Sequence, residues 1–244
     1  MLKILIRVAI SIVVVVGLVY GGILMYTKVI NPPEDKLNED DLSAIVSESS
    51  TAPSTDTESS TVISAPTTPD TGVTGTWLAT NESTVGYRVK EVLGGVDTEG
   101  VGRTNQVNGS LTIQDTTVLS TVFEIDVASI KSDSSKRDSQ FSGNIMDTAT
   151  YPTATFRLLT PIDLGTIPTD GQSITATAQG ELTLHGVTQP VSFEVTAKIA
   201  NGIIGVLGSI DITFADYGIA NPSNAFVTTG DTGLLEFVLA FQKG

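Results

Sequence analysis

GELTLHGVTQPVSFEV, residues 180–195, carries the strongest fold signal in this chain. His185-Gly186 separates two strand-like runs, and a two-residue connection of this kind is typical of a tight β-hairpin. From residue 191 to residue 199 the odd positions are apolar and the even positions are polar or charged. A strand with this pattern has one buried and one solvated face, so the stretch predicts antiparallel neighbours.

The same two-residue period recurs in Val85–Val89, Phe123–Val127 and Ile210–Phe214. Asn201-Gly202 predicts a second hairpin, and Asn108-Gly109 predicts a turn or a bulge before another strand. Helical periodicity is almost absent after residue 75. The pattern therefore indicates an all-β antiparallel barrel or sandwich. A barrel of about eight strands is just wide enough to be filled by side chains or to hold one small ligand.

Three segments interrupt this pattern. Ser134–Ser142 predicts one short helix that Asp133 caps and Gly143 ends. Its Phe141 would pack against the barrel as a lid or plug. Gly94–Arg103 contains four glycines and predicts a loop that either gates the barrel or only connects two strands. The long segment Asn221–Gly233 is rich in small residues, and it would either shape the mouth of a tunnel or be displayed to a partner protein.

The first thirty residues predict a membrane anchor. Val8–Tyr26 is a run of nineteen uncharged residues that follows Lys3 and Arg7. At about 1.5 Å per residue it is about 28 Å long, close to the hydrocarbon thickness of a bilayer. We predict that residues 1–30 form an uncleaved, single-pass anchor with the domain outside the cytoplasm. A cleaved signal peptide is the alternative, and the protein would then be secreted.

Residues 31–74 are rich in Ser, Thr, Pro and acidic residues and contain few large apolar side chains. Such a segment buries too little surface to offset its ordering entropy. We therefore predict a disordered linker, spanning roughly 35–40 Å as a flexible coil. It would lift a folded domain of residues 75–244 off the membrane.

Composition excludes several classes of protein. The formal net charge is −14, and residues 1–74 contain nine acidic and four basic residues, which leaves about −9 on the domain. The domain has no basic run, which argues against nucleic-acid binding, because that binding needs Lys and Arg at the phosphates. The absence of cysteine excludes disulfides, thiol nucleophiles and thiolate metal sites.

Two polar motifs are candidates for chemistry, and we favour a structural role for both. His185 is the only histidine, and no nucleophile or metal-ligand spacing accompanies it. We expect its ring to bond backbone at the hairpin. Arg137-Asp138 predicts charge pairs that fix the short helix, and the alternative is that Arg137 contacts the polar head of a ligand at the barrel mouth. We predict no catalytic site, no metal site and no cofactor.

The phenylalanines face the predicted interior. Phe123, Phe193, Phe214, Phe237 and Phe241 lie on the inward phase of predicted strands. Such a lining suits both a dry, filled core and the wall of an apolar tunnel, because both bury the same face. The pattern alone favours the filled core.

A second segment, Ala128–Phe156, contains further motifs that precede those of residues 180–195 in a recognisable order. They are Ser129-Ile130, Arg137-Asp138, Tyr151-Pro152 followed by Phe156, and then GELTLHGVT at residues 180–188. Trp77 and Asp216–Ile219 are weaker matches. Together these residues resemble the YceI family of lipocalin-like barrels, which bind polyisoprenoid lipids, over roughly residue 75 to the C-terminus.

The resemblance implies a lipocalin-like barrel of about eight strands that encloses a long isoprenoid chain in an elongated tunnel. The residues expected to contact this lipid are Tyr87, Phe123, Ile125, Phe141, Phe156, Leu184, Phe193, Val195, Ile212, Phe214 and Phe237. Apolar burial at about 0.8 kcal/mol per CH2 would supply the affinity.

These observations give two hypotheses for function. The first is binding of a polyisoprenoid, quinone-like or similar long apolar lipid, for its transport, storage or sequestration at the cell envelope. The second is a protein-interaction module that displays loops from a stalked barrel to another envelope protein. An enzyme is the least favoured class, since its only support is His185 beside Thr183 and Thr188.

Overall fold

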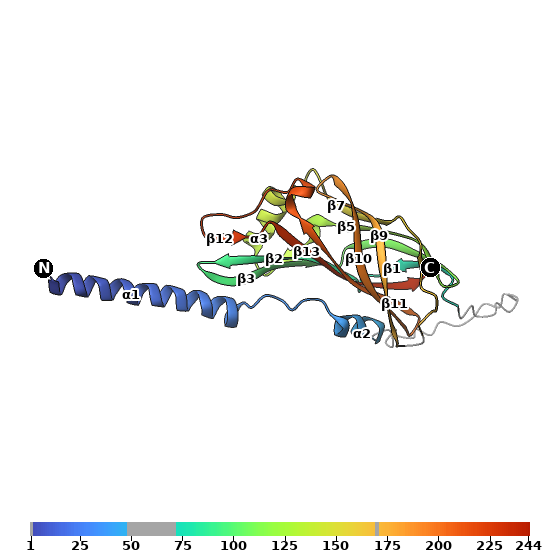
Figure 1. The fold of residues 1–244 in the computed structure, drawn as a ribbon, viewed down its shortest axis with the longest axis horizontal. Helices are drawn as coiled ribbons and strands as arrows, with labels where there is room; N and C mark the ends of the chain where they lie inside the picture. Colours follow the sequence, from blue (N-terminus) through green and yellow to red (C-terminus); the bar gives the residue numbers. More distant parts are fainter. Residues whose placement is uncertain (1, 48–71, 169–170) are drawn as a thin grey trace, which may run out of the picture.

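The computed structural model describes residues 2–47, 72–168 and 171–244, and its main body is a closed antiparallel barrel (Figure 1). Eight strands pair in the order β1-β4-β5-β7-β9-β10-β11-β13, and β13 pairs back with β1. They are β1 Gly75–Ala79, β4 Val107–Gln114, β5 Thr117–Asp126, β7 Thr153–Leu158, β9 Ser173–Leu184, β10 Val187–Ala200, β11 Ile203–Thr213 and β13 Thr232–Lys243. The predicted eight-stranded barrel is confirmed.

Shorter pairings lengthen the barrel at one end. The first half of β13 pairs with β2 (Thr84–Leu93), which pairs in turn with β3 (Val96–Thr104). Two small strands, β6 (Lys131–Ser132) and β12 (Val227–Thr229), join this end at β3 and β2. At the opposite end β8 (Ile162–Asp163) pairs with the start of β5.

Both predicted hairpins are present. His185 and Gly186, with φ of 51° and 75°, connect β9 and β10. Asn201 and Gly202, with φ of 53° and 74°, connect β10 and β11. Two successive positive φ values match the right-handed twist of the flanking strands.

The turn or bulge predicted at Asn108-Gly109 is wrong. Both residues lie inside β4, and the register shift against β5 occurs later, between Thr112 and Ile113. Gly109 serves a different purpose, because a Cβ there would stand 2.5 Å from Cδ1 of Phe123 on the neighbouring strand. The glycine makes room for an aromatic ring.

The short helix is present with two corrections. α3 spans Ser135–Gln140, and its cap is Ser134, whose side chain accepts from the Arg137 amide, rather than Asp133. The helix also does not end at Gly143, because the wider helical turn η3 (Phe141–Ile145) continues it. Gly94–Arg103 is not a loop, since Gly94 and Gly95 form the turn of the β2–β3 hairpin and the rest belongs to β3.

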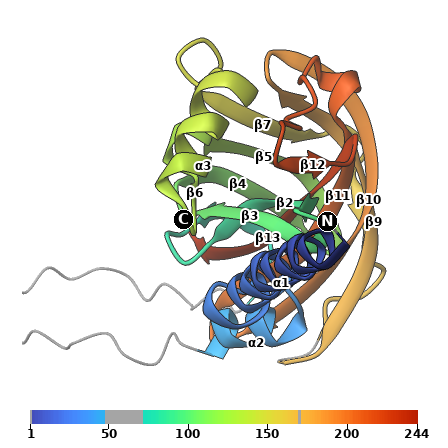
Figure 2. The ribbon, with the colours of Figure 1, turned by 90° about the vertical axis from the view of Figure 1, so that its left-hand side faces the viewer.

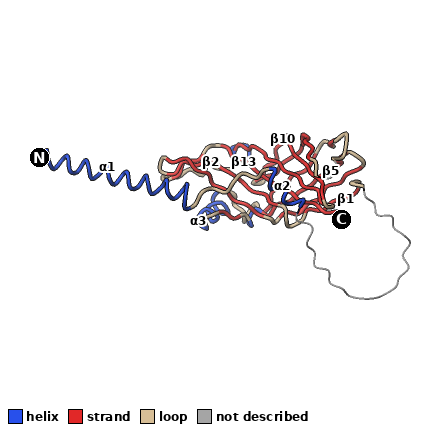
Figure 3. Tube along the Cα trace, turned by 90° about the horizontal axis from the view of Figure 1, so that it is seen from below, coloured by secondary structure: helices blue, strands red, loops and turns tan. Residues whose placement is uncertain are grey.

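The N-terminal segment begins with helix α1 (Leu2–Met25) and turn η1 (Tyr26–Ile30), which extend away from one end of the barrel (Figures 1 and 3). Helix α2 (Glu39–Ser47) then packs on the outside of the barrel (Figure 2). Its Leu42 and Val46 are 1% and 2% exposed.

The linker predicted from residue 31 is therefore wrong for residues 39–47. Leu42, Ile45 and Val46 form a narrow apolar stripe, which Gly205 on β11 admits close to the sheet. The remainder of the predicted linker, residues 48–71, lies outside the described part of the chain.

One seam of the barrel wall is only half closed. Pairing between β10 and β11 runs from Ala200 and Ile203 to Val195 and Gly208. Beyond that point a polar groove of about 630 Å³ lies between the two strands and beside Lys36 and Leu37. Its lining includes the inward-facing Phe193 and the outward-facing Glu194, so the groove crosses the wall.

Candidate binding cavity

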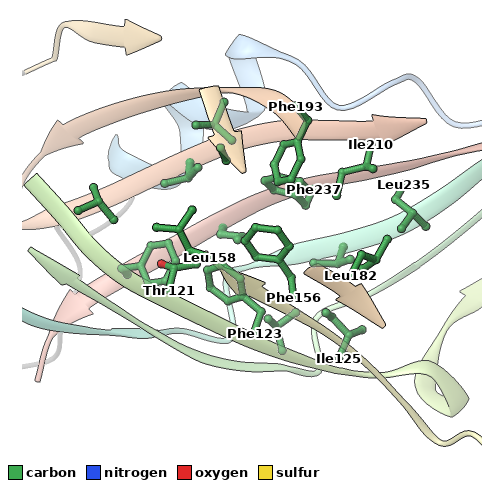
Figure 4. Close-up of a pocket in the computed structure, with 18 of the residues that line it drawn as sticks. Thr121, Phe123, Ile125, Phe156, Leu158, Leu182, Phe193, Ile210, Leu235 and Phe237 are labelled. Carbon is green, nitrogen blue, oxygen red and sulfur yellow. The ribbon is translucent and has the colours of Figure 1, made fainter. Parts of the chain in front are cut away.

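The barrel interior contains cavities that follow one another along its length. The largest, about 500 Å³, lies at the end formed by α3, β2 and the segment around β12. The second, about 120 Å³, lies in the middle of the barrel (Figure 4). Val85, Ile125, Leu182 and Leu235 line both, so these four residues, which we call the waist, lie between the two cavities. We call the larger one the mouth cavity and the smaller one the central cavity.

The central cavity is almost entirely apolar. Among its lining residues only Thr121 carries a polar side chain group (Figure 4). Phe156 and Phe193 meet edge to face with ring centroids 5.3 Å apart, and Phe193 meets Phe237 in the same way at 6.0 Å. A third cavity of about 70 Å³ continues toward β8 and shares Val118, Ile162, Val195 and Val206 with the central cavity. Cavities therefore follow one another through the apolar interior, so the barrel is not completely filled by side chains.

Glycines on neighbouring strands allow the aromatic rings to lie flat against the wall. A Cβ on Gly180 would stand 2.5 Å from the Phe156 ring, and a Cβ on Gly102 would stand 2.5 Å from the Tyr87 ring. On Gly208, a Cβ would lie 2.9 Å from Cε2 of Phe237. Contacts shorter than 3.0 Å require something to move. Because the glycines have no side chain, the neighbouring rings do not have to move into the lumen.

The mouth cavity is apolar on its walls and polar at its rim. Tyr87 stacks on Phe141 with ring centroids 4.7 Å apart, which confirms the predicted packing of Phe141. Burial raises the pKa of Tyr87 far above its ordinary value, and Arg137 offsets only part of that rise. The polar rim consists of Glu91, Arg137, Gln140, Asn144, Asn221, Ser223, Asn224 and Thr229.

Arg137 and Asp138 do fix the helix, as predicted. The carboxylate of Asp138 accepts from the amide and hydroxyl of Ser132 at 2.8 and 2.7 Å. Arg137 pairs with Glu91 at 3.3 Å and with Asp133. Arg137 also lines the mouth cavity.

His185 holds the hairpin to the neighbouring η4 turn (Phe214–Tyr217). Its Nδ1 is 3.1 Å from the carbonyl of Tyr217, and its ring packs edge-on against Tyr151 at 4.6 Å. Tyr151-Pro152 leads directly into β7, as predicted. In the described ranges no group of three or more His, Cys, Asp or Glu side chains could hold a metal ion.

The structure places all eleven predicted contact residues on the two main cavities. Phe123, Phe156, Phe193, Val195 and Phe237 line the central cavity, while Tyr87, Phe141, Leu184, Ile212 and Phe214 line the mouth cavity, and Ile125 lines both. Their contact with a ligand stays a prediction. Among the lining residues, sequence reasoning did not single out Val85, Leu182 and Leu235 at the waist or Glu91, Gln140 and Asn144 at the polar rim.

A signal for part of the missed set existed. Leu182 lies on the apolar phase of β9, in the stretch with the clearest alternation. Asn221, Ser223 and Asn224 have no periodicity, and only the topology brings them over the mouth.

Within the described ranges one helix is long and apolar enough to cross a membrane, and it comprises Ser11–Ile30. Only 6% of it is buried. Its position near the N-terminus is compatible with both a membrane anchor and a signal peptide.

Comparisons with known proteins agree with this fold. The family model described as "YceI-like domain" matches residues 77–241. A UPF0312 protein of Vibrio parahaemolyticus is 28% identical over 127 residues, which cover 48% of this chain and 64% of that protein. The match thus spans somewhat less than two thirds of this curated relative.

A solved structure shows the same barrel. A polyisoprenoid binding domain from Saccharophagus degradans, implicated in plant cell wall breakdown, superposes with a TM-score of 0.58 at 18% identity. The match covers 70% of this chain and 99% of that domain. BcnA of Burkholderia cenocepacia is 23% identical over 63% of this chain and 95% of its own, with a TM-score of 0.48.

Proposed function

This chain belongs to the YceI-like family, and from that premise we propose that its barrel binds one long apolar lipid of the polyisoprenoid or isoprenoid-quinone kind. The observation that carries the proposal is the pair of adjacent cavities, of which the central one is lined almost entirely by apolar residues and the mouth cavity also has polar residues. An extended hydrocarbon chain with one polar end has the matching distribution of polarity.

The geometry supports one orientation for the lipid. The hydrocarbon chain would pass the waist at Leu182 and Leu235 and lie along Phe156, Phe193 and Phe237. The polar end would stay at the mouth, near Arg137 and the side-chain amides of the rim. Burial of apolar surface provides about 0.8 kcal/mol per CH2 group, so most of the affinity would come from the chain.

We further propose that α1 anchors the protein in a membrane and that the barrel carries, stores or sequesters its lipid at the cell envelope. The long uncharged run Val8–Tyr26 supports the anchor. We propose no catalytic role, since His185 and Arg137 both have structural partners. The interaction-module hypothesis is less favoured, because Asn221–Asn224 lines the cavity mouth instead of standing clear of the barrel.

The test is the lipid content of the full chain after production in a lipid-replete bacterial host. Native mass spectrometry of the detergent-solubilised protein, followed by organic extraction, should reveal one bound apolar lipid per barrel. Leu235→Trp would add bulk at the waist, whereas Val122→Trp adds it to an outward position that is 46% exposed.

We expect the wild type and V122W to retain the lipid. We expect L235W to lose about tenfold in affinity, equivalent to about 1.4 kcal/mol. A wild-type protein that carries no extractable lipid and binds none when it is offered would refute the proposal.

A further inference from the structure

The mouth cavity opens at the end of the barrel from which α1 emerges. The β2–β3 hairpin, β12 and α3 surround the mouth, and all three lie at the α1 end of the molecule (Figure 1). The helix contacts this end directly. Lys28 Nζ donates to the carbonyl of Asp97 at 2.9 Å, and Asn31 Nδ2 donates to Asp133. The mouth therefore has a defined position relative to the helix.

These contacts place the tip of the hairpin beside the apolar part of α1. A Cβ on Gly94, at the hairpin turn, would stand 2.6 Å from Cδ1 of Ile23. Ile23 precedes Tyr26, the last residue of the uncharged run, by three residues. At about 1.5 Å of rise per residue, Gly94 lies about 4.5 Å inside the apolar end of the helix. If α1 spans a bilayer, the hairpin tip reaches below its surface.

A second apolar group lies at the same level. The amide of Gly94 donates to the carbonyl of Phe226 at 3.4 Å, so Phe226 is held beside the hairpin tip. Phe226 is 80% exposed, and Val92 on β2 is 37% exposed. A large exposed aromatic residue is costly in water but favourable at a membrane interface, where aromatic residues are enriched.

We propose that the apolar tip, defined as Val92–Gly95 and Phe226, inserts into the leaflet at the end of α1, so that the adjacent mouth cavity opens into the lipid phase. The partner is the bilayer itself. A long apolar lipid would then move between bilayer and tunnel without crossing water. This inference rests on the membrane anchor of the proposed function, but it concerns the placement of the mouth and not the identity of the lipid.

The charges near the apolar tip indicate that the attachment to the membrane is apolar. Arg137 at this end is paired with Glu91 and Asp133, and Lys28 donates to the backbone carbonyl of Asp97, so neither cation is free of protein contacts. Insertion should therefore depend weakly on salt and should occur on zwitterionic lipid.

Single-cysteine labelling tests the placement, because the chain contains no native cysteine. Phe226→Cys reports on the apolar tip, and Val15→Cys reports on the anchor. Leu78→Cys reports on the far end of the barrel, because Leu78 lies on β1 and is 50% exposed. Each full-length variant receives an environment-sensitive nitrobenzoxadiazole label and is reconstituted into phosphatidylcholine vesicles. The acyl chains carry quenching bromines either near the headgroup or near the bilayer centre.

We expect F226C emission to fall about twofold or more with bromines near the headgroup, while L78C emission stays unchanged. V15C should be quenched most by the deep bromines. Quenching of F226C supports the inference whatever V15C does, whereas an unquenched F226C overturns it. V15C separately decides the anchor, and lipid extraction separately decides the bound lipid.

Val92→Cys provides a second position on the apolar tip in case the label at position 226 distorts the mouth cavity. It should show the same quenching as F226C, and the absence of quenching at both positions overturns the inference.

Discussion

Gly208→Ala should narrow the tunnel by moving a single aromatic ring. Gly208 lies on the inward phase of β11, directly opposite Phe237 on β13. A Cβ at this position meets only ring atoms of Phe237, with Cε2 at 2.9 Å and Cε1 at 3.2 Å. No backbone atom is among the three nearest contacts, so the Phe237 ring must move while the strands can keep their positions. Since Phe237 lines the central cavity of about 120 Å³, it yields into the lumen.

The free-energy cost follows from two opposing effects. Replacing a strand glycine by alanine stabilises the fold by about 0.5–1 kcal/mol through reduced backbone entropy in the unfolded chain. Overpacking a filled region costs about 1–3 kcal/mol. We therefore expect a net loss of about 0.5–2 kcal/mol in the free energy of unfolding. The affinity for lipid should fall further, because the displaced ring occupies the path of the hydrocarbon chain.

Urea unfolding and lipid occupancy by native mass spectrometry measure both effects. Gly143→Ala is the matched control, because a Cβ there has no atom within 4 Å and the backbone φ is not positive. The double variant Gly208→Ala/Phe237→Leu should recover the occupancy that G208A loses, because the smaller side chain frees the lumen. Unchanged stability and occupancy in G208A would refute the argument that glycines hold the rings against the wall.

Three further predictions follow from buried groups. Glu236 is 1% exposed and pairs with Arg103 at 2.8 Å and with Arg88 at 3.4 Å. Glu236→Gln should therefore lower the free energy of unfolding, measured in urea, by about 2–4 kcal/mol. A change below about 0.5 kcal/mol would contradict the contribution of these ion pairs. Leu42→Ala should release α2 from the barrel at a cost of about 2–3 kcal/mol, seen as faster hydrogen exchange in residues 39–47, with exposed Ser47→Ala as the control. Burial raises the pKa of Tyr87, so the native state keeps a proton that the unfolded chain loses above about pH 10, and stability should decrease as pH rises past that value. Tyr87→Phe should lessen that decrease, and an equal pH profile in both proteins would show that Tyr87 does not contribute.

The strands and hairpins could be predicted because their signals are local. Alternation in Val191–Ile199 and the pairs His185-Gly186 and Asn201-Gly202 depend only on neighbouring residues, and each matches the structure. Helix α2 was missed because its apolar stripe is only three residues wide in a segment of otherwise disordered composition. Packing on β11 stabilises it, and that contact is not visible in a local window.

The distinction between a tunnel and a filled core was beyond periodicity, since both bury the same face of each strand. Gly109, Gly180 and Gly208 did offer a readable clue, because a glycine inside a strand often marks the close approach of another group. The mouth was less accessible to prediction. Its polar residues come from β2, α3, η3, Asn221–Asn224 and β12, and only the tertiary fold brings these segments together.

The half-closed seam between β10 and β11 has a consequence for truncated forms of this protein. Two strand edges that lack a neighbour can recruit strands from other molecules, and this is a common route to aggregation. Pro190, Glu194 and Asp211 lie along the groove and discourage such pairing, while the stretch at Lys36 and Leu37 runs beside it. A soluble form that begins at residue 75 would lose that stretch and α2 together. We expect it to self-associate at concentrations where a form beginning at residue 31 stays monomeric, as light scattering would show.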